Sequence, residues 1–108
     1  MPKIINANDF GAEVLKSELP VIVDFFASWC NPCTTISRIL DEISMDFAGK
    51  VKIVKLDYEK SKDTAKKYGI KRLPTLVFFN NGEIVDHAIG IMEKNQIAQK
   101  LNSLIESF

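Results

Sequence analysis

The sequence predicts an α/β fold in which helices cover both faces of a mixed central sheet. Short apolar runs typical of buried strands alternate with segments whose apolar residues recur at helical spacing. Near the end of the chain, an Asn-Gly pair at positions 81–82 separates two strand-like runs, as in a β-hairpin. The expected order is β-α-β-α-β-α-β-β-α, with the last two strands antiparallel. The 108 residues show no repeat or linker, which indicates a single domain over residues 1–108.

The first half of the chain predicts two strands and two helices. Lys3–Asn6 indicates a short first strand, and Asn8 is placed to cap the helix that follows it. Val21–Ala27 is an apolar run typical of a buried strand. A longer helix comes next and ends at Gly49. Its apolar face consists of Ile36, Ile39, Leu40, Ile43 and Phe47.

The second half predicts a third strand, a short helix, the hairpin and a last helix. Val51–Asp57 indicates the strand, and Ser61 is placed to cap the short helix, which ends at Tyr68-Gly69. Thr75–Asn80 and Glu83–Ile89 form the two strands of the hairpin. The final helix presents one apolar stripe to the sheet. That stripe consists of Ile97, Leu101, Leu104, Ile105 and Phe108.

The only two cysteines, Cys30 and Cys33, lie three positions apart where a strand gives way to a helix. The unpaired amide groups and the macrodipole at a helix N-terminus stabilise a thiolate, which is the form that attacks disulfides. Pro32 suits an early helical position, and Asn31 can cap the helix and hydrogen-bond near the sulfurs, so both residues are expected to tune the reduction potential. Two inert core cysteines or a zinc site are the alternatives, but His87 is the only histidine available as a further ligand.

The composition limits the cell compartments and the kinds of partner that we expect for this protein. One closely spaced cysteine pair favours a reducing compartment, and the N-terminus lacks an apolar stretch typical of a signal peptide or membrane span. We therefore expect a cytoplasmic protein. The formal net charge is zero, which gives no general attraction to nucleic acid or to an anionic membrane.

Several separate segments together resemble the thioredoxin family along nearly the whole chain. Trp29 precedes the cysteine pair, Pro32 lies within it, and a distant Pro-Thr pair at 74–75 opens a strand. The remaining matching segments are Val23–Phe25, Ala27-Ser28, Lys55–Asp57, Lys67–Ile70, Asn81-Gly82 and Gly90. The resemblance implies a thioredoxin fold. Asn31 departs from the glycine that is usual at this position.

The resemblance also implies a role for each residue near the pair. Cys30 is the expected nucleophile and is expected to be exposed, whereas Cys33 is recessed and resolves the mixed disulfide. Asp24 is an acid in an apolar strand, where burial raises a carboxyl pKa. It is expected to lie behind Cys33 and to accept the proton of that thiol. Lys55 is expected to pair with Asp24, and a solvated edge-strand aspartate is the alternative.

A substrate-docking rim is expected from residues that are distant in sequence. Leu73-Pro74 resembles the cis-proline turn of the family, and Arg72 replaces a common glycine beside it, which adds a cation to the rim. Gly90 permits close approach of a partner. The expected substrate-binding residues are Trp29, Arg72, Leu73, Pro74, Thr75, Gly90 and Ile91.

These features predict a thiol-disulfide oxidoreductase that reduces protein disulfides through Cys30-Asn31-Pro32-Cys33 and is re-reduced by a thioredoxin reductase. It needs no cofactor beyond the Cys30–Cys33 disulfide and no metal. A monomer is expected, because the rim must stay open to many partners. A dithiol oxidase or isomerase and a non-enzymatic binding module are the alternative functions.

Overall fold

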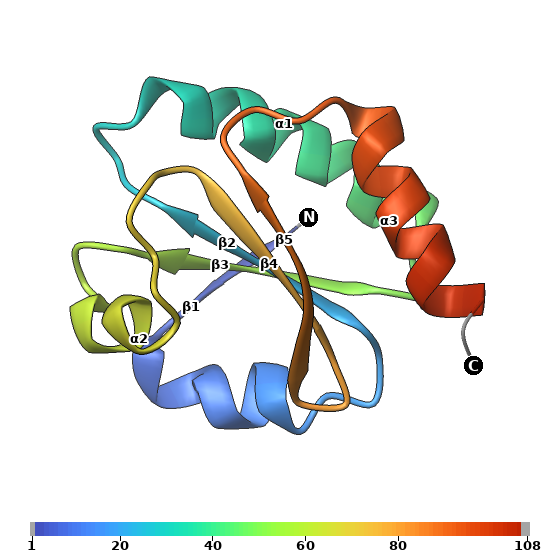
Figure 1. Cartoon of the computed structure of the whole chain (residues 1–108), viewed down its shortest axis with the longest axis horizontal. Helices are drawn as coiled ribbons and strands as arrows, with labels where there is room; N and C mark the ends of the chain where they lie inside the picture. The colour runs from blue at the N-terminus through green and yellow to red at the C-terminus, as the bar shows by residue number, and fades with distance from the viewer. Residues whose placement is uncertain (1, 107–108) are drawn as a thin grey trace.

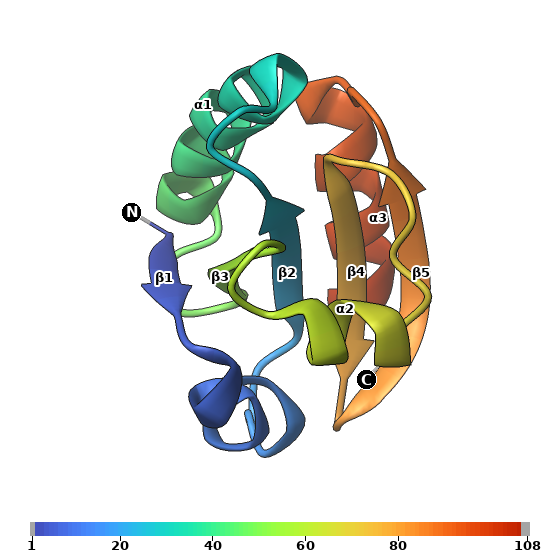
Figure 2. The ribbon, with the colours of Figure 1, turned by 90° about the vertical axis from the view of Figure 1, so that its left-hand side faces the viewer.

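The computed structural model describes residues 2–106 and contains a five-stranded mixed sheet (Figure 1). The strands lie in the order β1-β3-β2-β4-β5, which Figure 2 shows from left to right. β3 is parallel to both β1 and β2, whereas β4 is antiparallel to β2 and β5. Their bounds are Lys3–Ile5 for β1, Val21–Phe26 for β2, Lys52–Asp57 for β3, Thr75–Asn80 for β4 and Glu83–Ile89 for β5. This sheet confirms the predicted fold class.

Helices cover both faces of the sheet. α1 (Asn31–Asp46) and α3 (Lys94–Glu106) pack on one face, while α2 (Lys62–Lys67) lies on the other, in front of the sheet in Figure 2. Alternate residues of each strand point to opposite faces, so β2 contributes to two separate apolar cores. Ile22 packs with α1 and α3, and Val23 packs with the N-terminal segment and α2.

The first helix differs from its prediction. It consists of a 3₁₀ turn, η1 (Ala7–Asp9), and a π turn, η2 (Gly11–Leu15), and Asn6 rather than Asn8 precedes it without a side-chain cap. The amide of Lys16 bonds to the carbonyl of Gly11, five residues back, which makes the turn wider than an α-helical one. Gly11 is a weak helix former, and the segment buries Phe10 and Val14 in the core without regular helix geometry.

Other element ends move by only a few residues. The first strand ends at Ile5, and α1 ends at Asp46, three residues before the positive-φ Gly49. Ser61 lies at the N-cap of α2, but its side chain makes no capping hydrogen bond. Phe108, the last residue of the predicted apolar stripe, lies outside the described residues.

The hairpin has the expected turn residues. Asn81 and Gly82 have φ values of 53° and 79°, the positive values that a two-residue type I′ turn requires. A Cβ on Gly82 would lie 2.8 Å from the carbonyl oxygen of Leu15 in η2. The hairpin therefore needs glycine for two reasons: its backbone conformation and its close approach to the N-terminal segment.

A candidate dithiol site at one edge of the sheet

Strand register brings three distant segments to one edge of the sheet. Phe25, near the end of β2, pairs with Thr75 at the start of β4, and Thr75 pairs with Ile89 at the end of β5. The amide of Gly90 donates a hydrogen bond of 2.9 Å to the carbonyl of Pro74. The loop that follows β2, the loop that precedes β4 and the segment that follows β5 therefore meet at this edge.

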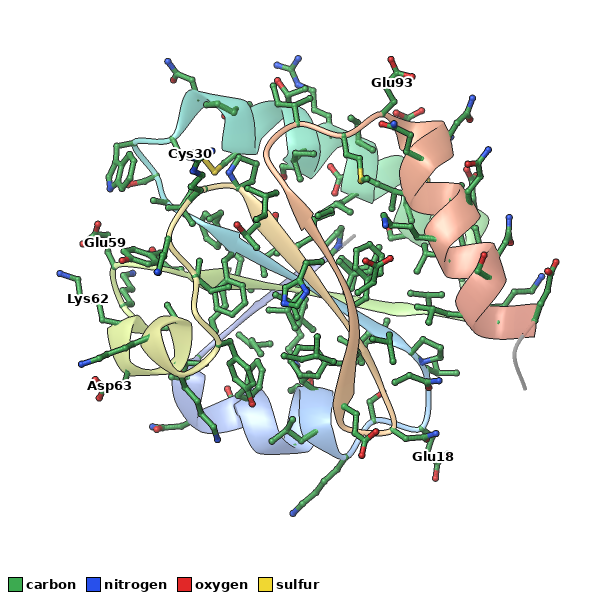
Figure 3. The ribbon with its side chains drawn as sticks, viewed as in Figure 1. Glu18, Cys30, Glu59, Lys62, Asp63 and Glu93 are labelled. Carbon is green, nitrogen blue, oxygen red and sulfur yellow. A yellow bond between two sulfur atoms is a disulfide. The ribbon has the colours of Figure 1, made fainter. Side chains whose placement is uncertain are left out.

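Cys30 and Cys33 form a disulfide at this edge, with their Cα atoms 5.4 Å apart (Figure 3). Both cysteines are buried, so the expectation that Cys30 is exposed is wrong for this oxidised form. The physical reason is packing: the bonded pair forms a small apolar cluster with Ala27, against which Phe26 and Leu73 also pack.

The disulfide coincides with the start of α1. Cys30 occupies the N-cap, and its sulfur accepts a hydrogen bond of 3.3 Å from the amide of Cys33. Asn31 is therefore the first helical residue and does not cap the helix, contrary to the prediction, while Pro32 lies in the first turn as expected. An amide donor and the positive end of the helix dipole both favour negative charge on the Cys30 sulfur.

Asp24 is fully buried in the central strand β2, which rules out a solvated edge-strand aspartate. Neither carboxyl oxygen has a hydrogen-bond partner within residues 2–106. Desolvation raises the pKa of Asp24 from 3.8 to about 7, and the charge of Lys55 opposes part of this rise. A carboxyl group with such a pKa can gain and lose a proton near neutral pH.

Lys55 is the register partner of Asp24 on β3, but the two side chains form no direct ion pair in the described chain. Instead, the Lys55 ammonium donates a hydrogen bond of 2.8 Å to the hydroxyl of Ser37 in α1. The same ammonium lies 4.8 Å from the ring centroid of Phe26. Ser37 was not among the sequence candidates, although its position four residues after Cys33 places both on one face of α1.

The expected rim residues belong to the three segments that meet at this edge of the sheet. Trp29 and Ile91 remain 65% and 61% exposed. The Leu73-Pro74 peptide bond is cis, as the resemblance implied. Arg72 is exposed, and its carbonyl accepts a hydrogen bond of 2.6 Å from the Thr75 hydroxyl.

Glu59 is a further neighbour that sequence reasoning missed. Its carboxylate accepts a hydrogen bond of 3.2 Å from the Trp29 indole and lies 3.6 Å from the Lys62 ammonium. In Figure 3, Glu59 and Lys62 lie on the same side of the molecule as Cys30. No sequence motif links positions 29 and 59, because the contact arises only when the loop after β3 folds beside the loop after β2.

Within residues 2–106, no group of three or more His, Cys, Asp or Glu side chains is arranged to hold a metal ion. No helix within the same residues is both long and apolar enough to cross a membrane.

A buried disulfide at a helix N-terminus, next to a cis-proline loop on a mixed sheet, defines the protein as a dithiol-disulfide exchange protein. The family model named Thioredoxin matches residues 1–103. Thioredoxin from Rickettsia conorii is 44% identical over 98 residues, covering 91% of this chain and 93% of the relative. Thioredoxin from Synechocystis is 43% identical over 104 residues, covering 96% of each chain. Thioredoxin from Haemophilus influenzae is 41% identical over 101 residues, covering 94% of each chain.

The chain therefore belongs to the thioredoxin family. It is a thiol-disulfide oxidoreductase, and its redox group is the Cys30–Cys33 disulfide rather than a separate cofactor.

Proposed function

We propose that this protein reduces disulfide bonds in other proteins and receives its electrons from a thioredoxin reductase. The observation that carries the proposal is the hydrogen bond from the Cys33 amide to the Cys30 sulfur at the start of α1. The same donor that contacts this sulfur in the disulfide can stabilise its thiolate after reduction. A stabilised thiolate at Cys30 is the nucleophile that disulfide reduction requires.

The reaction has two exchange steps. In the first, the Cys30 thiolate attacks one sulfur of the substrate disulfide, which forms a mixed disulfide and releases the other substrate sulfur as a thiolate. In the second, Cys33 loses its proton and attacks Cys30, which restores the internal disulfide and releases the second substrate sulfur. Two electrons pass to the substrate, and the reductase returns two electrons to the protein.

Asp24 is the proposed acceptor of the Cys33 proton. Its carboxyl group is buried and unpaired, and its pKa of about 7 allows it to take up a proton near neutral pH. Lys55 is the proposed partner of Asp24, since its charge lowers the pKa of the carboxyl. Asn31 and Pro32 are the proposed residues that tune the reduction potential.

The residues around the disulfide are the proposed docking rim for substrates; Trp29, Arg72 and Ile91 are exposed, whereas Pro74 and Thr75 are buried. Trp29 and Ile91 offer apolar contact, and Gly90 leaves space for a partner at the end of β5. The loop of Leu73, Pro74 and Thr75 offers backbone groups to an extended substrate segment. Arg72 is the proposed determinant of preference for substrates with acidic residues near the disulfide.

We further propose that residues 1–108 act as one domain and as a monomer in the cytoplasm. The single cysteine pair supports a reducing compartment, where a structural disulfide would not persist. A monomer leaves the rim free for partners of different shapes.

The reduction potential of the Cys30–Cys33 pair tests the direction of electron flow. The oxidised protein is equilibrated with redox buffers, and the free thiols are counted by alkylation and mass spectrometry. A value of about −270 mV supports a reductase. A value of about −180 to −120 mV, the range of isomerases and strong oxidants, would instead assign an oxidase or isomerase.

A further inference from the structure

We propose that Ser37 is a positioning residue for the exchange reaction, because its hydroxyl holds the Lys55 ammonium at the cavity that Cys30 and Cys33 line, and away from a direct ion pair with Asp24. This inference rests on the proposed role of Asp24 as the proton acceptor.

Two contacts fix the position of the ammonium. The Lys55 Nζ atom lies 2.8 Å from Ser37 Oγ and 4.8 Å from the ring centroid of Phe26. Ser37 and Lys55 also line the same surface cavity as Cys30 and Cys33. The cation is therefore held at an opening that reaches the sulfurs, while Asp24 lies fully buried.

Few charged or titratable groups face Asp24. Lys55 approaches from β3, whereas Cys33 of α1 is held in the disulfide and carries no titrating thiol in this form. From β4, the register partner is the apolar Leu76. Within the described chain, Lys55 is the only charged group that shifts the pKa of Asp24. The position of the Lys55 ammonium therefore determines how far a neighbouring charge lowers the pKa of Asp24.

The Ser37 hydroxyl competes with Asp24 for that ammonium. A direct ion pair would stabilise the carboxylate, lower its pKa and make it a weaker base for the Cys33 thiol. With the ammonium bound to Ser37, its charge acts on Asp24 from a greater distance. It therefore offsets only part of the rise in the Asp24 pKa that desolvation causes. Asp24 therefore keeps its proton affinity near neutral pH.

The test is the Ser37→Ala variant. Its Asp24 carboxyl is titrated by carbon-13 NMR in the oxidised protein, and resolution of the mixed disulfide is followed in single-turnover experiments across pH. We expect the pKa of Asp24 to fall by about one unit, since a close opposite charge lowers a carboxyl pKa by about 1–3 units. The lower limb of the pH profile for resolution should shift by the same amount.

Three further variants make the test specific. Ser37→Thr keeps a hydroxyl and should restore both the pKa and the pH profile. Ser44→Ala is the matched control, because Ser44 is also a partly buried serine of α1 but bonds to the carbonyl of Asp41. In a Lys55→Gln background, Ser37→Ala should cause no further shift, since the proposed effect acts through the lysine.

An unchanged or raised pKa in Ser37→Ala would overturn the inference, as would an equal shift in the Lys55→Gln background or in Ser44→Ala. Failure of the underlying role of Asp24 has a different signature. In that case Asp24→Asn leaves the rate of resolution unchanged, while the NMR titration of Ser37→Ala still reports whether Ser37 positions the lysine.

Discussion

Asp24 and Lys55 are register partners on the adjacent parallel strands β2 and β3, yet their charged groups do not bond to each other. The lysine bonds to Ser37, and the carboxyl group has no hydrogen-bond partner in residues 2–106. A buried carboxylate without a partner is costly, so protonation relieves the desolvation. This relationship links the stability of the fold to the chemistry of the dithiol.

The first prediction concerns stability and pH. In the folded protein the pKa of Asp24 is about 7, above its ordinary value of 3.8, so between these pH values the folded chain holds a proton that the unfolded chain releases. Protonation of Asp24 therefore stabilises the folded state fully below about pH 4, and this stabilisation is lost as the pH rises to about 7. The free energy of unfolding falls by about 4 kcal/mol in total over this range. Asp24→Asn should remove this loss, as measured by urea unfolding of the oxidised proteins at pH 4.5 and 8.

The quantity to compare is the difference in the free energy of unfolding between wild type and Asp24→Asn at each pH. Glu13 and Asp86 have lowered pKa values, but both are present in wild type and variant, so their effects cancel in that difference. A stability difference that stays constant between pH 4.5 and 8 would contradict a raised pKa for Asp24.

The second prediction separates the two exchange steps. Cys33→Ser should trap the mixed disulfide with substrate, and Cys30→Ser should not form it. Asp24→Asn should slow resolution on the order of a hundredfold, the size of a typical general-base effect, and leave the first attack nearly unchanged. Rapid quenching with acid, followed by mass spectrometry, measures both steps. Equal slowing of the two steps would mean that Asp24 supports the site generally rather than acting as the base for Cys33.

The third prediction concerns substrate choice. Arg72 is exposed on the loop that precedes β4, so Arg72→Glu should lower kcat/KM for a peptide disulfide flanked by acidic residues and raise it for a basic counterpart. A rim charge changes association and its salt dependence, and we expect changes of roughly threefold to tenfold at low salt. Lys50→Glu is the control, because Lys50 is exposed just before β3, at the opposite edge of the sheet. Similar effects of both variants would indicate net charge alone.

The fourth prediction concerns the hairpin. Gly82 and Gly49 both have φ of +79°, but only at Gly82 would a Cβ meet backbone, at 2.8 Å from the Leu15 oxygen. Each substitution by alanine should cost about 1–2 kcal/mol for the left-handed backbone, and Gly82→Ala should cost about 1–3 kcal/mol more. Thermal or urea unfolding at one pH measures the difference. Equal losses would show that the hairpin can move away from η2.

Periodicity was sufficient to predict most of the fold. The hairpin strands Thr75–Asn80 and Glu83–Ile89 have the predicted bounds, because the Asn-Gly turn and the apolar runs are local signals. The first helix was predicted less well. Phe10 and Val14 are buried, and tertiary packing selected 3₁₀ and π turns that a helical period does not distinguish.

For the candidate site too, some features could be predicted from the sequence and others could not. Cys30 and Cys33 could be identified from their spacing, and Asp24 could be identified because it is an acid in an apolar strand. Cys30 is buried, and it occupies the N-cap that was predicted for Asn31. Both features depend on how the loop packs in three dimensions. The contacts of Ser37 with Lys55 and of Glu59 with Trp29 join residues 18 and 30 positions apart.

The sequence by itself therefore determined the order of the elements, the dithiol and the buried acid, because each is encoded in neighbouring residues. Only the tertiary structure decided which partner Lys55 takes, how deeply the disulfide lies and which segments form the rim. These properties depend on strand register and on the packing of α1 against the sheet, and they bring together side chains that the sequence keeps apart.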